Sequence, residues 1–496
     1  MFYTSTRDNS VKAESFTAIA QGISNDGGLF APTEFPEVDM KTLDAMTDMS
    51  YNERAKAILA GFLSGFTIDE IGMCVESAYT AEKFGAKNPA PIVNVYDSMN
   101  MLELWHGPTC AFKDMALQIL PHLLSVSSKK HDGDKDIVIL VATSGDTGKA
   151  ALEGFKDAPK TKLLVFYPDS GVSSMQQRQM NTQEGDNLAV CAIKGNFDDA
   201  QTGVKNIFTN NRINQKLLSK NMMFSSANSI NLGRLLPQII YYFSAYCELV
   251  NNKNICIGDK INFVVPTGNF GNILAAYYAL KMGLPVNKLI CASNKNNILT
   301  DFLNTGSYDK NRSFHTTISP SMDILISSNL ERLLFDIYGQ NAQAVSALMK
   351  SLSNDGKYEI SSDIKKKLEA VFYGGYCDDV KTKETIKNLF EKYGYLCDTH
   401  TAVAAAVYEE YIEKTGDKTQ TVIASTASPY KFAGSVLDAF GRNDMQDEFA
   451  QLDLLFDITK SEIPKPILDL KEKEIRFNNV CTTDTMEQKV FELLGI

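Results

Sequence analysis

The sequence lacks the features of several protein classes. Its longest apolar stretches, such as residues 136–143 and 261–266, are far shorter than the roughly 18 uncharged residues that a membrane-spanning helix needs. Its nine cysteines stand singly, without a Cys-x-x-Cys pair, which predicts free and mostly buried thiols. Its five histidines form no His-Glu-x-x-His pattern or Cys/His cluster, so we expect no bound metal.

Positive charge is also scarce. The chain has 49 Lys and Arg residues against 60 Asp and Glu residues, a net charge of −11, which repels a polyanionic backbone and makes nucleic acid an unexpected partner. No basic segment followed by an apolar one comes after Met1, so we expect a cytoplasmic protein without a membrane partner. Glycine and proline, at 31 and 15 residues, are too few for a fibrous or disordered chain.

What the sequence does contain is the pattern of a large α/β protein. Its 496 residues are enough for about three domains of ordinary size. Runs rich in Val and Ile, without polar alternation, predict strands that are buried on both faces at residues 137–142, 162–167, 188–193, 261–265, 289–292 and 421–425. Helical patterns, such as residues 198–208 and 273–282, lie between these runs. This alternation predicts an α/β sheet.

The first part of the chain differs from the rest. Residues 1–94 are rich in helical patterns and end at Lys87-Asn88-Pro89-Ala90-Pro91, where each residue before proline is pushed out of the helical region. We therefore predict an N-terminal domain over residues 1–94. For the remainder we predict a large α/β domain, a smaller inserted α/β domain and a C-terminal tail, at residues 95–135 with 236–450, 136–235 and 451–496 respectively.

The residues after each predicted strand carry the candidate chemistry, because ligands of open α/β sheets bind beyond the carboxyl ends of the strands. Pro266-Thr267-Gly268-Asn269-Phe270-Gly271-Asn272 leads from a strand into a helix. Its glycines and the helix N-terminus would let backbone N–H groups bind a phosphate. The spacing matches neither a Walker A loop nor Gly-x-Gly-x-x-Gly, which disfavours a nucleotide. A helix start that needs glycine only for tight packing is the alternative.

A second loop of this kind is Thr143-Ser144-Gly145-Asp146-Thr147-Gly148. Its hydroxyl and N–H groups would suit a carboxylate or a second phosphate, with Lys149 nearby. A simple N-cap by Ser144 or Asp146 is the alternative interpretation.

Lys113 breaks a local rule. It lies at the start of a predicted helix, where the macrodipole disfavours a cation, and it is flanked by the apolar Phe112 and Met115. A desolvated lysine amine loses its proton more easily and can act as a nucleophile that forms a Schiff base. The alternative is a surface lysine. Nearby His106, beside the single Trp of the chain, is better interpreted as a packed residue than as a base. The predicted helix has core spacing at Ala116, Ile119, Leu120, Leu123 and Leu124.

Taken together, these segments resemble the threonine synthase family, pyridoxal-phosphate enzymes of the tryptophan-synthase-β fold type. The stretches that carry the resemblance are residues 3–7, 27–30, 106–114, 144–148, 268–272 and 425–427. The first two belong to an additional N-terminal domain that is typical of this branch. The resemblance implies two open, mostly parallel sheet domains with the cofactor cleft between them, plus a helical N-terminal domain.

The resemblance also implies roles for individual residues. Lys113 would be the Schiff-base lysine of pyridoxal 5'-phosphate, and Thr426 would bond the pyridine nitrogen. The cofactor phosphate would be held by Gly268, Asn269, Phe270, Gly271 and Asn272. The substrate would be contacted by Ser144, Asp146, Thr147, Asn228, Asn231 and Arg234, with Arg234 a candidate for its phosphate.

The implied reaction converts O-phospho-L-homoserine and water to L-threonine and phosphate, the last step of threonine biosynthesis, in a monomer or homodimer. Two alternatives remain open. A related phospholyase or dehydratase would use the same lysine but release 2-oxobutyrate and ammonia. A non-catalytic binding protein would be expected to lose Lys113 or the loop at residues 268–272, and both are present.

Overall fold

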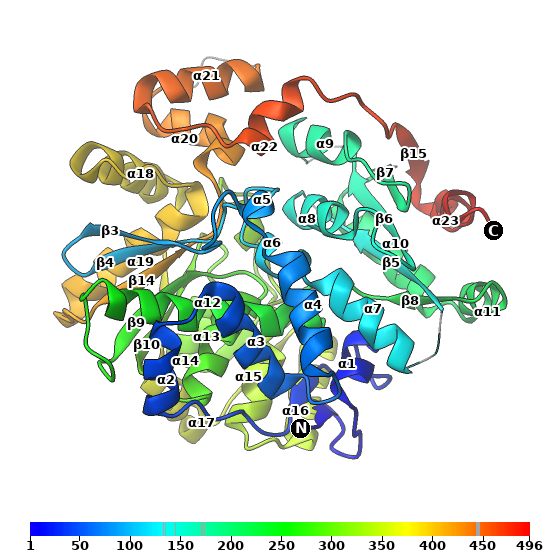
Figure 1. The fold of residues 1–496 in the computed structure, drawn as a ribbon, viewed down its shortest axis with the longest axis horizontal. Coiled ribbons are helices and arrows are strands. Elements are labelled where there is room, and N and C mark those ends of the chain that lie inside the picture. The colour runs from blue at the N-terminus through cyan, green and yellow to red at the C-terminus, as the bar shows by residue number, and fades with distance from the viewer. Residues whose placement is uncertain (132, 134, 144, 170–171, 173, 443–446) are drawn as a thin grey trace.

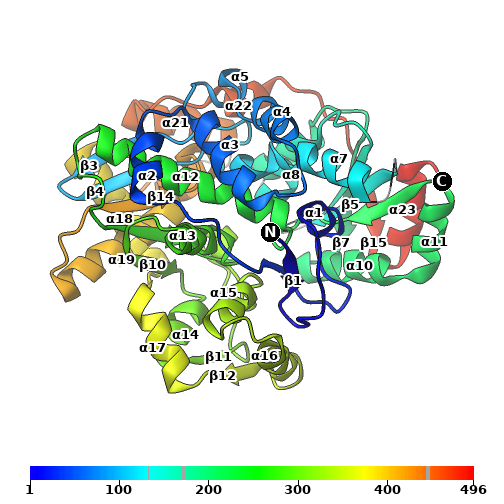
Figure 2. The same ribbon diagram turned by 60° about the horizontal axis from the view of Figure 1, so that its bottom comes forward.

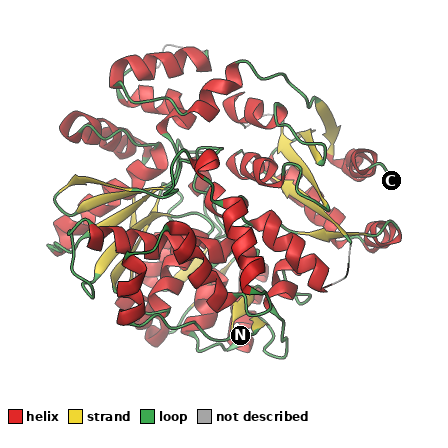
Figure 3. Cartoon of the chain, in the orientation of Figure 1, coloured by secondary structure: helices red, strands yellow, loops and turns green. Residues whose placement is uncertain are grey.

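Two mostly parallel sheets form the framework of the protein and stand on opposite sides of the molecule (Figure 1, Figure 3). The computed structural model describes residues 1–131, 133, 135–143, 145–169, 172, 174–442 and 447–496. The fold class expected from the sequence and the resemblance, an α/β protein with two open sheets and a helical N-terminal region, is confirmed.

The first sheet has six strands in the order β13-β10-β9-β14-β4-β3. Their bounds are Phe372–Tyr376, Val286–Ser293, Ile261–Pro266, Thr421–Ser425, Met99–Glu103 and Ile92–Tyr96. All pair in parallel except the edge strand β3, which is antiparallel to β4. Alternate residues of β9 reach different cores: Phe263 packs with the helices α12 (Leu232–Asn251) and α13 (Gly271–Lys281), and Val264 packs with α18 (Asp379–Tyr393) and α19 (Thr399–Thr415). This sheet is therefore covered on both faces.

The second sheet has five strands, all parallel, in the order β15-β7-β6-β5-β8. Their bounds are Asn479–Thr482, Leu188–Lys194, Thr161–Pro168, Asp136–Ala142 and Met222–Ser225. One face packs on α10 (Phe197–Thr209), α11 (Asn211–Ser219) and α23 (Met486–Leu494). The other packs on α7 (Leu120–His131), α8 (Asp146–Phe155) and α9 (Ser174–Asn181). Residues at alternating positions of β5 are thus buried on both faces, as the absence of polar alternation predicted.

The N-terminal region wraps the front of the molecule between the two sheets (Figure 1). It contains β1 (Tyr3–Ser5), α1 (Ser15–Gln21), β2 (Phe30–Pro32), α2 (Met40–Thr47), α3 (Tyr51–Phe62), α4 (Ile68–Ala78) and α5 (Ala81–Phe84). A further group of elements projects below the first sheet (Figure 2). It contains α14 (Ile298–Thr305), β11 (Ser307–Asp309), α15 (Leu330–Ile337), α16 (Ala342–Asn354), β12 (Lys357–Glu359) and α17 (Ser362–Val371).

The helix expected after Lys113 is interrupted. The chain forms α6 (Asp114–Leu117), turns at Gln118 and then forms α7. Pro121, the second residue of α7, has no backbone N–H, and its ring would clash with the carbonyl of Leu117 in a continuous helix. The prediction of one helix through this run was therefore wrong, whereas the six predicted strands are all present.

The end of the chain connects the two sheets. Helices α20 (Ala433–Ala439), α21 (Glu448–Thr459) and α22 (Lys465–Leu468) pack beside the first sheet, whereas β15 and α23 complete the second sheet (Figure 1). Residues 451–496 thus contribute to both cores, whereas the predicted division treats them as a separate C-terminal tail. The domain boundaries themselves stay a prediction. Among the described helices, none has the length and hydropathy that a membrane crossing requires.

Candidate active site

Lys113 lies where loops from both sheets meet. It forms the N-cap of α6, in the segment that follows β4 of the first sheet. Its Nζ lies 3.6 Å from Asp146 Oδ2, at the start of α8 beyond β5 of the second sheet. It also donates a long hydrogen bond of 3.4 Å to Ser321 Oγ, in the turn η1 (Pro320–Met322). The lysine that sequence reasoning singled out therefore lies between the two sheets.

The surroundings of Lys113 favour its neutral amine. Its side chain is only 11% exposed, and burial lowers the pKa of the ammonium. Asp146 acts in the opposite direction, while Lys431 and Arg234 lower the pKa further. Lys113 is thus a desolvated amine in a field of both signs, as a nucleophilic lysine requires.

The β9–α13 loop, residues 267–270, leaves no room for side chains on one side. A Cβ on Gly268 would lie 2.6 Å from the carbonyl oxygen of Ser321, so only glycine fits. Phe270 adopts a left-handed conformation with φ of 62° and is buried. The loop is held by Ser327 Oγ, which donates to Gly268 O at 2.7 Å, and by Asn329 Nδ2, which donates to Asn269 O at 3.0 Å. These bonds fix the strand-to-helix turn that leads into α13.

Asn272 supplies an unused donor at this helix start. The hydroxyls of Tyr241 and Tyr242 both donate to its Oδ1, at 2.6 and 2.5 Å. Its Nδ2 is buried and finds no hydrogen-bond partner among the described residues. An unpaired buried donor is costly unless a ligand completes it. Together with the glycine turn, this amide makes the loop fit an anion such as a phosphate.

Thr426 lies on the segment that faces the Lys113 segment. Phe112 N donates to Thr426 O at 2.8 Å, and Ala111 pairs with Ala427 in an isolated antiparallel bridge. Thr426 follows β14 directly and is buried. The structure therefore places Thr426, predicted to bond the ring nitrogen, on a segment that runs beside the segment of Lys113.

The β5–α8 loop presents Asp146 to the first sheet. Thr143 Oγ1 accepts from Gly145 N at 2.9 Å and from Gly148 N at 3.0 Å, which closes the turn from within. Asp146 is buried, and Thr147 is half-buried beside it. Ser144, predicted as a substrate residue, lies outside the described residues. Lys149, expected near the ligand, instead pairs with Glu153 at 3.3 Å.

The start of α12 supplies the remaining predicted residues. Asn231 caps this helix and spends both polar atoms of its side chain on backbone groups, so its amide serves the fold. Asn228 is exposed one turn earlier. Arg234 is buried, donates to Ala227 O at 2.9 Å and forms no ion pair with any described residue. Its Nε has no partner in that part of the chain either, and burial lowers its pKa to about 10.

Sequence reasoning missed several neighbours of Lys113. His400 Nε2 accepts from Ser321 N at 3.1 Å, and its Nδ1 donates to Asp398 Oδ2 at 2.7 Å, which holds the turn that contacts Lys113. Lys431, in the short turn η2 (Pro429–Phe432), reaches Asp146 Oδ1 at 2.8 Å. The signal for Lys431 was its place shortly after a strand end, the rule that found the other loops. His106 pairs with Glu103 at 2.8 Å and stacks on Trp105, as a packed residue does.

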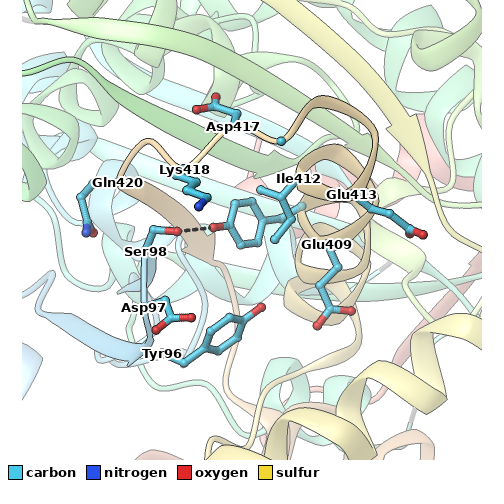
Figure 4. A pocket seen from close by; sticks show the side chains of 11 residues that line it. Tyr96, Asp97, Ser98, Glu409, Ile412, Glu413, Asp417, Lys418 and Gln420 are labelled. Atoms are coloured by element: carbon cyan, nitrogen blue, oxygen red, sulfur yellow. Dashed lines mark hydrogen bonds between the residues drawn. The ribbon is translucent and has the colours of Figure 1, made fainter.

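A groove elsewhere on the molecule can be separated from this site. It has a volume of about 660 Å³ and is lined by Tyr96, Ser98, Glu409 and Lys418 among others (Figure 4). Ser98 and Gln420 precede β4 and β14, so the groove lies at the amino ends of strands whose carboxyl ends lead to the site. No residue predicted for the site lines it.

Comparison with known proteins agrees with the geometry. Residues 2–79 match the family model "Threonine synthase N terminus", residues 102–426 match "Pyridoxal-phosphate dependent enzyme", and residues 401–490 match "Threonine synthase, C-terminal". The threonine synthase of Saccharomyces cerevisiae is 35% identical over 99% of this chain and 98% of its own length. The chain belongs to the threonine synthase family.

Other members of the threonine synthase family differ in length. Threonine synthase-like 1 of Homo sapiens is 38% identical over 87% of this chain, but the chain spans only 59% of that protein. The crystal structure of pyridoxal-phosphate-bound threonine synthase from Brucella melitensis has a TM-score of 0.88 and 35% identity, covering 99% of both chains. The similarity thus extends over the whole fold.

Membership in the pyridoxal-phosphate dependent enzymes makes pyridoxal phosphate the cofactor, and the described residues fit it. The β9–α13 loop has a glycine that a Cβ would force against Ser321 O, and Asn272 carries an unpaired buried amide that a phosphate oxygen would complete. Lys113 supplies a dry amine within reach of both sheets. Within the described residues, no group of three or more His, Cys, Asp or Glu side chains gathers as a metal site would need.

Proposed function

We propose that this chain converts O-phospho-L-homoserine and water to L-threonine and phosphate. The observation that carries the proposal is a pair of anion sites that flank one buried lysine. On one side, Ser321 contacts Lys113 and lies against Gly268, and Asn272, four residues after Gly268, carries an unpaired buried amide. On the other, the buried guanidinium of Arg234 has no ionic partner among the described residues and acts on the charge of Lys113. Two phosphates, one on the cofactor and one on the substrate, match two such sites.

The residues then have separate tasks. Gly268, Asn269, Phe270, Gly271 and Asn272 would hold the cofactor phosphate, Thr426 its ring nitrogen and Lys113 its reactive carbon. When bound, pyridoxal phosphate supplies an electron sink for the carbon that loses a proton. Lys113 is the base that takes the proton from the substrate Cα, because its amine is buried and lies near the β5–α8 loop and the turn η1. Arg234 binds the phosphate that leaves from Cγ.

The substrate amino acid would lie against the β5–α8 loop. We assign its α-amino and carboxylate groups to Asp146, Thr147 and Ser144, the last of which lies outside the described residues. Asn228 and Asn231, at the start of α12, are also proposed to contact the substrate. The N–H groups at the N-terminus of α8 favour a carboxylate there. Because Asn231 already bonds backbone groups, its contribution would be to hold the start of α12 in place.

We further propose a cytoplasmic monomer or homodimer without nucleic-acid or membrane partners. The nine cysteines are unpaired thiols, and eight of them are buried, which suits a reducing compartment. The net charge of −11 disfavours polyanions. Gel filtration with light scattering of the purified chain distinguishes a monomer from a dimer, and a larger assembly would contradict the proposal.

Product analysis tests the reaction. Purified protein given O-phospho-L-homoserine should release phosphate and L-threonine in equal amounts. Phosphate accompanied by 2-oxobutyrate and ammonia would instead assign the lyase alternative, which shares Lys113 and the cofactor loop. L-serine or L-threonine alone should be poor substrates, since neither brings the phosphate that Arg234 would bind.

A second experiment tests the lysine. Borohydride reduction of the cofactor-loaded protein, followed by peptide mass spectrometry, should place the cofactor on Lys113. Lys113→Ala should fold but form neither the adduct nor threonine, whereas Lys129→Ala, an exposed lysine of α7, should retain both. An adduct on any other lysine would remove Lys113 from its proposed role.

A further inference from the structure

Asp146 lies between two buried lysine side chains. Lys431 Nζ lies 2.8 Å from Asp146 Oδ1, and Lys113 Nζ lies 3.6 Å from Oδ2. The side chains of Lys431 and Asp146 are 1% and 4% exposed, so water screens this pair little. Two amino groups therefore share one carboxylate in a dry space. Of these two lysines, Lys431 alone is within hydrogen-bonding distance, so it is the principal charged partner of the carboxylate, which also accepts a longer bond of 3.3 Å from Gln176 Nε2.

Lys431 is fixed in this position by the segment that carries Lys113. Its Nζ also donates to Thr109 O at 2.8 Å. The turn η2 that bears Lys431 is joined to the same segment because Ser428 N donates to Cys110 O at 3.1 Å. Lys431 Nζ thus makes two short polar contacts, whereas the polar contacts of Lys113 Nζ among the described residues are the long bond to Ser321 Oγ and the more distant carboxylate of Asp146. The Asp146 carboxylate is therefore paired mainly with Lys431, which is not predicted to react, and less closely with Lys113.

The charged groups around Lys113 come from three elements. Asp146 at the start of α8 favours its ammonium form, whereas Lys431 of η2 and Arg234 of α12 oppose it, and burial lowers its pKa. Burial alone would raise the pKa of Asp146, but Lys431 and Lys113 outweigh this effect and lower it, with a smaller contribution from His400. Asp146 therefore stays ionised and available to Lys431.

We propose that Lys431 is a positioning residue that occupies the Asp146 carboxylate, so that Lys113 keeps no counter-ion of its own and reaches the neutral amine that its chemistry needs. This inference rests on the proposed role of Lys113. It assigns to Lys431 no contact with substrate or cofactor. It also explains why an acidic residue can lie beside a lysine that must lose its proton.

The test measures the protonation of Lys113 directly. The full-length protein, freed of cofactor, is reacted with 1-fluoro-2,4-dinitrobenzene across a pH series, and labelling of the Lys113 peptide is quantified by mass spectrometry. In Lys431→Met, Asp146 would turn to Lys113 and one repelling charge would be lost. The pH midpoint for Lys113 labelling should therefore rise by about one unit or more. Lys431→Arg keeps the charge and should keep the midpoint near that of the wild type.

Two further variants make the outcome decisive. Lys383→Met removes a surface lysine that pairs with Asp438 at 2.5 Å and should leave the Lys113 midpoint unchanged. Lys431→Met with Asp146→Asn leaves no unpaired carboxylate, so it should fold even where the single variant does not, and its midpoint should lie below that of Lys431→Met. Circular dichroism reports folding in each case.

The results separate the two proposals. A folded Lys431→Met protein with an unchanged Lys113 midpoint would overturn the role of Lys431, as would an Arg variant shifted as far as the Met variant. A double variant with the same midpoint as Lys431→Met would overturn it too. The proposed function fails separately, if borohydride attaches the cofactor to a lysine other than Lys113. In activity assays, the acid limb of the kcat/KM profile should move upward in Lys431→Met and return in Lys431→Arg.

Discussion

Two loops of similar design meet at the site, but they are held in place differently. The β9–α13 loop of the first sheet is bonded by neutral groups of its own neighbourhood, Ser327 and Asn329, and Asn272 at the start of α13 adds a buried side-chain donor without a partner among the described residues. The β5–α8 loop of the second sheet is closed by Thr143, but its buried Asp146 depends on a lysine from the other side of the site. The first loop is held without any charged group from the described part of the second sheet. The second loop, in contrast, needs Lys431 from the first-sheet side to pair with its buried Asp146.

This difference predicts that the first loop determines cofactor affinity and the second loop determines turnover. Under the proposed roles, a phosphate binds the β9–α13 loop as it stands, since hydrogen bonds already hold its backbone and the Asn272 side chain. Asp146 can pair with Lys431 only when the two sheets are correctly placed relative to each other. Damage to the first loop should therefore reduce cofactor affinity, whereas damage to the second should reduce turnover with less effect on cofactor affinity.

The largest effect is expected from filling the glycine position of the first loop. In Gly268→Ala the new Cβ would lie 2.6 Å from Ser321 O, so the loop or the turn η1 must move. We expect cofactor affinity to weaken by about 5- to 150-fold, because overpacking by one methyl group costs about 1 to 3 kcal/mol. Cofactor titration followed by absorbance measures this.

Gly72→Ala is the matched control. Gly72 lies within α4, and a Cβ there would meet no atom within 4 Å. Alanine should therefore leave cofactor affinity unchanged and stabilise the helix slightly. Equal affinities for Gly268→Ala and the wild type would show that the phosphate binds elsewhere.

The second loop should respond in turnover. Asp146→Asn keeps the shape of the side chain but removes the charge that Lys431 and Lys113 share. We expect kcat/KM to fall by about 10- to 30-fold, equivalent to about 1.4 to 2 kcal/mol, with a smaller change in cofactor affinity. Steady-state kinetics and cofactor titration of the same preparations give the comparison.

The exposed Asp186, which precedes β7 at the opposite edge of the second sheet, provides the control. Its carboxylate is fully exposed and its ion pair with Arg476 is long, 3.9 Å, so Asp186→Asn should leave both quantities unchanged. Should Asp146→Asn weaken cofactor binding as much as Gly268→Ala does, the distinction between the two loops would be lost.

Much of this framework was readable in the sequence because both faces of the central strands are buried. Strand β5, for example, has no polar alternation, and the residues that follow it fall at the carboxyl edge where ligands bind. The edge strands gave no such signal. Strand β13 contains Gly374 and Gly375, and β3 is largely half-exposed or exposed.

Partners that are distant in the chain were beyond the reach of local patterns. Strand β15 pairs with β7, but nothing near residue 480 specifies that partner. Lys431 looks like a solvated lysine in its own sequence context, and its burial depends on Thr109, 322 residues away, and on Asp146. Local reasoning therefore finds the loops of the site, whereas the charges between them become visible only in the assembled fold.

Helix α7, which leads from the Lys113 segment to β5, adds a pH dependence. His122 of α7 is mostly buried, and this burial, with help from Lys83, lowers its pKa to about 4 from 6.5. The folded state resists a proton that the unfolded state accepts, so stability is full above pH 6.5 and falls as the pH drops toward 4. Between pH 7 and pH 5 the wild type should lose about 1 to 2 kcal/mol through this group.

Urea unfolding at the two pH values measures the loss. His122→Gln cannot be protonated, so it should lose less stability than the wild type over the same interval. His106→Gln, whose imidazole is partly exposed beside Glu103, provides a comparison for replacing a histidine as such. Parallel losses in the wild type and His122→Gln would refute the assignment.

The smallest effect should come from the C-terminal segment, which gives the second sheet its other link to the first. Arg178 of α9 donates to Leu470 O at 2.6 Å and to Lys471 O at 2.9 Å, and Leu470 is buried in the core beside the first sheet. Arg178→Gln should cost about 1 kcal/mol, the contribution of a charge-assisted bond at a partly exposed site. Because α9 also brings Gln176 to Asp146, with Nε2 at 3.3 Å from Oδ1, KM should rise a few-fold while cofactor affinity stays unchanged.

The control is Arg212→Gln, which removes a surface ion pair with Glu487 and should change neither KM nor cofactor affinity. If Arg178→Gln weakened cofactor affinity instead of KM, the C-terminal segment would act on the first loop, and the independence of that loop would be wrong.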